Sequence, residues 1–128
     1  MIAPSRWRPY SIAAGEFPVP VQIILNQHKG PLPVTASFKP VTDGPCCLIV
    51  SGSVWSQAVN HMIGVQVSLD NAPIGTASIY SNATATHRAL VPTYIPLKLA
   101  FGNHQVTLSA LPGTLGDLND LYDIVLEY

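Results

Sequence analysis

The sequence predicts an all-β protein, an antiparallel β-sandwich of about eight strands. Apolar and polar residues alternate with a period of two in several segments, and turn-forming residues recur about every ten positions, as in sandwiches and barrels. Twelve of the 128 residues are proline, and many of them flank the alternating segments. Because proline has no backbone N–H to donate, this placement is typical of strand ends and sheet edges. Long helices have no room in this pattern.

Two strands have the clearest pattern. In residues 63–69 the apolar side chains of Ile, Val, Val and Leu occupy every second position, and residues 104–110 repeat the alternation with His104 at its start. Successive side chains of a strand point to opposite faces, so each segment is expected to bury one face. We therefore expect His104 to be a hydrogen-bonded histidine of the core or of an interface rather than a metal ligand.

The other elements follow in order along the chain. The remaining predicted strands are Val19–Asn26, Val34–Phe38, Cys47–Trp55, Ile74–Tyr80, His87–Val91 running on through Tyr94–Leu99, and Ile124–Tyr128. Residues 70–73 (Asp-Asn-Ala-Pro) predict a short hairpin, and Pro112 with Gly113 ends the strand before them. The spacing of Leu115, Leu118 and Leu121 predicts one or two helical turns before the last strand.

The length of 128 residues predicts a single domain. We assign residues 1–18, with Trp7, Tyr10 and Phe17 among prolines, to an extended N-terminal arm. Residues 19–128 are then the β-sandwich domain.

Charge is scarce and nearly balanced. Only 10% of the residues are charged and the net charge is −1, whereas an ordinary domain carries about 25%. Without a basic surface the chain has no electrostatic footprint for nucleic acid. So little charge on a small surface favours a homo-oligomer whose copies cover one another's apolar patches. The alternative is a monomer covered by Ser, Thr, Asn and Gln side chains.

Neither a membrane span nor a signal peptide is predicted. The longest aliphatic run, Cys46–Val50, is far shorter than the roughly 20 apolar residues that a spanning helix needs. Prolines and arginines interrupt the first nine residues, so Sec export is not expected. The sequence leaves the location unknown, and an extracellular destination would require another route, such as the surface of a virion or particle. Cys46 and Cys47 are predicted to be reduced thiols, because neighbouring cysteines form a strained ring.

The order of features over residues 46–128 resembles the C1q/TNF-like jelly-roll domains of bacterial and phage fibre-head and surface proteins. Residues 102–108 (Gly-Asn-His-Gln-Val-Thr-Leu) match a Gly-x-His-x-apolar-Thr-apolar strand, and an apolar last strand ends the chain. The resemblance implies a homotrimer of jelly rolls, each of eight to ten strands, with the last strands near the threefold axis. It implies no catalytic residues.

An acidic segment near the C-terminus is a candidate calcium site. Its oxygen-bearing residues are Asp117, Asn119, Asp120 and Asp123. Hard cations prefer such ligands, but the spacing does not follow the EF-hand pattern. The alternative is that these side chains accept hydrogen bonds from backbone N–H groups of the loop. No other cofactor is predicted.

A second candidate site is a binding surface for sugars. Aromatic faces stack on sugar rings and polar side chains bind the hydroxyl groups. The candidates of this kind are Trp55, Tyr80, Asn82, Thr84, His87 and Arg88. A plain surface hairpin would explain residues 80–88 equally well.

Catalytic motifs are not evident. Ser51-Gly52-Ser53 lies in a predicted strand and lacks the strand–turn–helix context of a nucleophile elbow. We therefore predict a non-enzymatic subunit that trimerises and presents loops to a glycan or cell-surface receptor. The alternative is a purely structural or decoration subunit of a larger particle, and a hydrolase or metal-dependent enzyme is the third hypothesis.

Overall fold

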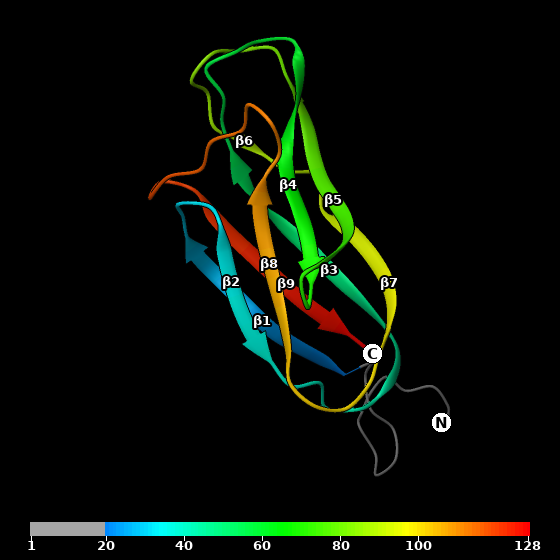
Figure 1. Cartoon of the computed structure of the whole chain (residues 1–128). Coiled ribbons are helices and arrows are strands. Elements are labelled where there is room, and N and C mark those ends of the chain that lie inside the picture. Colours follow the sequence, from blue (N-terminus) through cyan, green and yellow to red (C-terminus); the bar gives the residue numbers. More distant parts are fainter. Residues whose placement is uncertain (1–19) are drawn as a thin grey trace, which may run out of the picture.

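The computed structural model describes residues 20–128, so the predicted arm over residues 1–18 lies outside the described residues. Nine strands and no helix are found in the described part. They form two antiparallel sheets that pack face to face (Figure 1). The predicted antiparallel β-sandwich is therefore confirmed. Residues 20–128 also contain no helix of the length and apolarity needed to cross a membrane.

One sheet has five strands. Its members are β1 (Val21–Lys29), β9 (Leu121–Glu127), β3 (Gly44–Val54), β6 (Arg88–Ala89) and β7 (Thr93–Leu99). The order is β1-β9-β3, and β3 then pairs with both β6 and β7. A single strand can accept both partners because β3 is 11 residues long: β7 pairs with its first half and β6 with its end.

The other sheet has four strands, in the order β2-β8-β4-β5. They are β2 (Val34–Phe38), β8 (His104–Ala110), β4 (His61–Leu69) and β5 (Ala72–Ser81). The alternating segments that the sequence marked most clearly, 63–69 and 104–110, are the paired central strands β4 and β8.

The core lies between the two sheets. Completely buried side chains include Val65, Val67 and Val106 from the four-stranded sheet, and Ile124 and Leu126 from the five-stranded sheet. Burial of one such side chain contributes about 1.5–3 kcal/mol. The apolar side chains of the alternating segments thus stabilise the packing of the two sheets through their burial.

The outer faces of the two sheets differ. On the five-stranded sheet, register places Ile23, Val125, Ile49 and Tyr94 side by side on four adjacent strands. We call these four residues the apolar row. The outer face of the four-stranded sheet instead carries hydroxyl and amide groups, and its outward residues include Thr35, Ser37, Gln66, Ser68, Thr76, Ser78, Gln105, Thr107 and Ser109.

Both edges of the five-stranded sheet are irregular. Pro96 lies in the middle of β7 and has no N–H to offer a further strand. At the other edge, the pairing of β1 with β9 shifts register twice, between Ile23 and Leu25 and between Leu25 and His28.

The predicted helical turns around Leu115, Leu118 and Leu121 are wrong, because this part of the chain contains no helix. Leu115 forms an isolated β-bridge with Trp55, and the backbones of these two residues exchange both hydrogen bonds. Leu121 already belongs to β9, which begins three residues before the predicted strand. Pairing with distant segments therefore overrides the local helical spacing.

The predicted continuous strand over residues 87–99 is divided into β6 and β7. The division falls at Leu90–Pro92, where the Leu90 N–H donates to the Gly52 carbonyl of β3 (2.7 Å). Pro92 lacks the N–H that would continue the ladder. The two cysteines of β3 are free thiols, as predicted.

Candidate functional site

Three connections meet at one end of the sandwich, the upper part of Figure 1. They are the β3–β4 connection (55–60), the β5–β6 connection (82–87) and the β8–β9 connection (111–120). The Ala85 N–H donates to the Ser56 carbonyl (2.7 Å), and the Ser56 hydroxyl donates to the Gly113 carbonyl (2.7 Å). We call this region the loop end. These two hydrogen bonds join the three connections to one another.

The carboxylate of Asp120 lies at the centre of the loop end and is completely buried. One oxygen, Oδ1, accepts from the Ser53 hydroxyl (2.7 Å) and bonds His87 Nδ1 (2.7 Å). The other, Oδ2, accepts from the backbone N–H of Asp117 (2.8 Å). A buried carboxylate is tolerated only when it is fully hydrogen-bonded, and these contacts meet that requirement.

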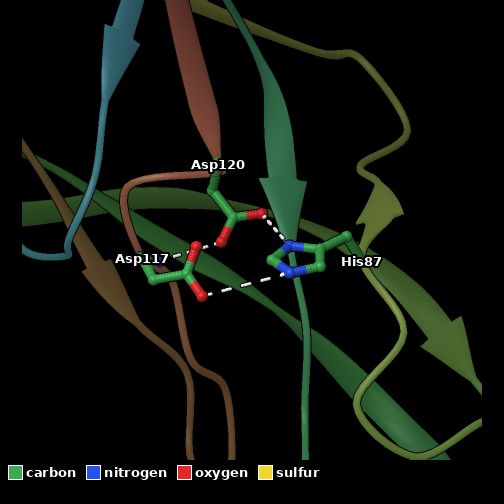
Figure 2. A group of neighbouring side chains, drawn as sticks. All are labelled: His87, Asp117 and Asp120. Atoms are coloured by element: carbon green, nitrogen blue, oxygen red, sulfur yellow. Dashed lines mark hydrogen bonds and ion pairs between the residues drawn. The ribbon is translucent and has the colours of Figure 1, made fainter.

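His87 faces two carboxylates, which lie together on one side of its ring (Figure 2). Its Nδ1 faces Asp120, and its Nε2 is 4.0 Å from Asp117 Oδ2. The hydrogen bond to Asp120 raises the pKa of His87, and the negative charges of Asp120 and Asp117 add to this effect. The ring also packs against Trp55, with 5.9 Å between the ring centroids and 41° between the planes.

This constellation does not form an acyl-transfer triad. In such a triad the serine hydroxyl bonds the imidazole, which withdraws its proton. Here the Ser53 hydroxyl donates to the Asp120 carboxylate instead. The contacts of Ser53, Asp120 and His87 thus join three segments of the chain but activate no nucleophile.

The structure places the six predicted sugar-binding residues in four groups, of which Tyr80 alone is one. Trp55 contacts His87 by ring packing, and Arg88 Nη2 donates to Asn82 Oδ1 (2.6 Å). Thr84 is exposed in the β5–β6 connection, and its carbonyl accepts from the Thr86 hydroxyl (3.1 Å).

Tyr80 lies away from the loop contacts. It is 51% exposed on the outer face of the four-stranded sheet, where its register partner is Met62. The predicted set is therefore spread over two surfaces, of which the loop end holds all but Tyr80.

An open pocket of about 340 Å³ lies at the loop end. Its lining residues carry no charge and are Ser56, Gln57, Ala58, Gly113, Thr114 and Leu115. The sequence did not point to these residues, because the two lining segments are more than 50 positions apart and neither matches a motif. Only the pairing of Trp55 with Leu115 brings them together.

The four predicted calcium ligands do not converge. Asp117 and Asp120 gather with His87, their ligand atoms all within 4.8 Å of one another, and this group does not include Asp123. Asp123 Oδ1 accepts from the Gln27 N–H on β1 (2.8 Å), and Asp117 Oδ1 accepts from the Asn119 N–H (2.8 Å). These bonds have the backbone-capping form that the sequence offered as the alternative, and calcium binding stays a prediction.

His104 is hydrogen-bonded through both ring nitrogens, as predicted for a histidine of this strand. Nδ1 lies 2.7 Å from Asp70 Oδ2, and Nε2 lies 2.8 Å from the Ala100 carbonyl oxygen. The pair links the β4–β5 turn to the β7–β8 connection, at the end of the sandwich opposite the loop end.

No protein-family model and no curated protein matches the sequence. Solved structures do match the fold. The crystal structure of dimeric latent PorU from Porphyromonas gingivalis aligns with a TM-score of 0.53 and 8% identity over 84% of this chain. The alignment covers only 12% of the PorU chain, so this chain spans about an eighth of that length.

Two carbohydrate-binding modules also align. The CBM36-1 domain of a multidomain xylanase from the hindgut metagenome of Trinervitermes trinervoides has a TM-score of 0.47 and 12% identity, with 85% of this chain and 97% of that chain covered. A family 35 module from Clostridium thermocellum has a TM-score of 0.46 and 11% identity, with 84% and 90% covered. The likeness lies in the fold. None of these structures tests the C1q/TNF-like resemblance, which stays a prediction.

Proposed function

We propose that this protein is a non-enzymatic attachment subunit. Three copies associate through the outer face of the five-stranded sheet, and the loop end of each copy binds a saccharide of a glycan or cell-surface receptor. The observation that carries the proposal is the open, uncharged pocket of about 340 Å³ at the loop end, whose two lining segments meet where the backbone of Trp55 pairs with Leu115. Such a subunit would act at a virion or particle surface or outside the cell.

The chemistry of the loop end suits a neutral, hydroxyl-rich ligand. Ligand sites of about 300–1,000 Å³ combine apolar lining with a few polar groups that fix orientation. Here Ala58 and Leu115 supply apolar lining, Gln57 supplies an exposed amide, and Asn82 with Arg88 adds polar groups on the neighbouring connection. Two of the similar folds named above are carbohydrate-binding modules, but the proposal for this chain rests on its own side chains.

A glycan array probed with the full chain, followed by calorimetry on each hit, tests the saccharide proposal. We expect Trp55→Ala to weaken binding at least about 30-fold, the effect of removing an anchor worth about 2 kcal/mol. Gln57→Ala is the second variant, because this exposed side chain lines the pocket without supporting the core.

Phe101→Ala is the matched control, since Phe101 is an exposed aromatic residue on the β7–β8 connection at the opposite end. The absence of any saccharide ligand would overturn the proposal. Equal affinities of the Trp55, Gln57 and Phe101 variants would overturn it as well.

A purely structural or decoration role is the second candidate, and exposed apolar side chains favour it. At the loop end Leu118 is 66% exposed, Val59 44% and Leu115 42%. Such a surface suits contact with another protein of a particle. If no saccharide binds and Leu118→Ser prevents assembly into the particle, the structural role replaces the attachment role.

A further inference from the structure

We infer that His87 and Asp117 form a binding site for one divalent transition-metal ion, with Zn²⁺ as the probe and Asp120 as the outer carboxylate that orients the imidazole. The inference goes beyond the proposed saccharide binding and does not depend on it. Three observations support it. They are the difference in hydrogen bonding between His87 and His104, the distance between His87 Nε2 and Asp117 Oδ2, and the unpaired buried hydroxyl of Tyr122.

His87 and His104 both bond a carboxylate through Nδ1, but their Nε2 atoms differ. In His104 this atom donates to the Ala100 carbonyl (2.8 Å), so both ring nitrogens carry hydrogens and neither can bind a metal. In His87 it has no hydrogen-bond partner among the described residues and faces Asp117 Oδ2 across 4.0 Å. With Nδ1–H donated to Asp120, the neutral ring presents the Nε2 lone pair to that gap.

The gap has the size of a metal site. A distance of 4.0 Å is too long for a hydrogen bond. Metal bonds to histidine nitrogen and carboxylate oxygen are each about 2.0–2.2 Å, so two ligands of one tetrahedral ion lie about 3.4 Å apart. A rotation of the Asp117 carboxylate by about half an ångström toward Nε2 would bring the two atoms to that spacing. The side chains of His87 and Asp117 are 39% and 41% exposed, which lets an ion enter and lets water complete its coordination.

Asp120 has the place of an outer-shell carboxylate. Metal-binding histidines usually donate their other N–H to a carboxylate, which fixes the ring orientation and makes the free nitrogen more basic. Asp120 receives that bond and is itself held by Ser53 and by the Asp117 N–H. The same residue therefore sets the direction of Nε2 and the position of the loop that carries Asp117.

The hydroxyl of Tyr122 gives a second, independent indication. Tyr122 is completely buried, and its hydroxyl has no hydrogen-bond partner in the described structure. The hydroxyl lies against Gly116, the residue that precedes Asp117. An unpaired donor is therefore buried beneath the loop that carries the proposed ligand, where a water molecule bound to the ion could accept its hydrogen bond.

The ligand set selects the class of ion. Imidazole suits zinc, copper, nickel and iron, whereas calcium and magnesium prefer sites made of oxygen alone. The site therefore differs from the calcium site predicted from residues 117–123, and a comparison of Zn²⁺ with Ca²⁺ separates the two.

Calorimetry with Zn²⁺ and with Ca²⁺ on the full chain tests the inference. The starting protein carries Cys46→Ser and Cys47→Ser, so that thiols do not bind the metal. We expect one Zn²⁺ per chain, loss of binding in His87→Gln, and at least about tenfold weaker binding in Asp117→Asn. His104→Gln is the matched control and should bind Zn²⁺ as the starting protein does.

Histidine ¹⁵N NMR of the starting protein provides a readout that needs no substitution at the proposed site. Addition of Zn²⁺ should shift Nε2 of His87 while leaving both nitrogens of His104 unchanged. The inference is overturned if Zn²⁺ does not bind, if His87→Gln retains full affinity, or if the zinc-dependent shift falls on His28 or His61 instead. Binding of Ca²⁺ at the same residues with equal affinity would also overturn the assignment of the ion.

Discussion

Single side chains fasten the loops of this sandwich at both ends, and the pair formed by Asp70 and His104 is the simplest case. Asp70 Oδ2 bonds the imidazole (2.7 Å), and Oδ1 accepts from the Gln105 N–H (2.9 Å). The hydrogen bond from His104 lowers the pKa of Asp70, and the same bond raises the pKa of His104. The charged forms of both groups are thus favoured in the folded protein.

The pair makes stability depend on pH. Because the folded pKa of His104 lies above the ordinary value of 6.5, its contribution is complete below pH 6.5 and is lost as the pH rises through the folded pKa. The contribution of Asp70 is complete above its ordinary value of 3.8 and is lost as the pH falls through its lowered folded pKa. We therefore expect the free energy of unfolding of the native chain to exceed that of His104→Gln most between about pH 4 and 6.5.

Urea denaturation of both proteins from pH 5 to 9 measures this difference. His87, whose pKa is also raised, titrates in both proteins, so its effect cancels in the comparison. A difference that stays constant from pH 5 to 9 would contradict the assigned direction of the His104 shift.

Among single residues, the sequence pointed to several members of the cluster at the loop end, but it did not predict that they lie together. His87 was predicted as a sugar contact, and Asp117 and Asp120 as calcium ligands, yet the structure joins all three. His87 lies about 30 positions before the two aspartates and on another connection, and the pairing of β3 with both β6 and β9 brings the three residues together. Ser53 was missed because it lies in a strand, where nothing in the local pattern distinguishes its hydroxyl.

Among the elements, the β4–β5 hairpin has the tightest backbone contact. Gly64 on β4 faces Ser78 on β5, and a side chain at Gly64 would collide with the Ala77 carbonyl oxygen and approach Ser78 Cα to 2.7 Å. The same glycine also bonds the β8–β9 connection, because its N–H donates to the Thr114 hydroxyl (3.0 Å). The absence of a side chain lets three segments pack closely.

Gly64→Ala should therefore destabilise the protein by about 1–3 kcal/mol, the usual cost of overpacking, because backbone atoms have to move. Urea unfolding measures the loss. Gln66→Ala, two residues further along the same face of β4, is the control and should change stability by less than about 0.5 kcal/mol. Equal effects of the two substitutions would show that the close approach at Gly64 carries no cost.

Strands were predictable where alternation is local and long. β4, β8 and the short β2 agree closely with the segments expected from their patterns. Residues 115–122 were mispredicted as helical turns because the structure of this segment depends on the bridge between Leu115 and Trp55, which the local pattern does not contain. The division of β6 from β7 likewise depends on a hydrogen bond to Gly52 in a distant strand.

The molecule as a whole has two unlike outer faces, and this contrast bears on how copies associate. The four-stranded sheet presents mostly hydroxyl and amide groups, whereas the five-stranded sheet presents the apolar row, whose end residues Ile23 and Tyr94 are 64% and 63% exposed. Because only 10% of the residues are charged, few charged side chains oppose contact between the outer face of the five-stranded sheet and another copy.

We expect sedimentation of the native chain to give about three times the monomer mass of 13.7 kDa. Ile49→Lys places a charge in the centre of the apolar row and should yield monomers, and Tyr94→Lys should do the same at an exposed position that does not support the core. Ser78→Lys on the other sheet is the matched control and should stay trimeric. A native chain that sediments as a monomer, or equal masses of all three variants, would contradict the trimer.

The irregular edges of the five-stranded sheet limit how copies of the protein can associate. A regular edge strand can recruit the same strand of another molecule and so extend into fibrils. Pro96 in β7 and the register shifts of β1 interrupt this hydrogen-bonding at the two sides. We therefore expect copies of the protein to associate through the outer face of this sheet, as proposed, and not by adding strands at its edges.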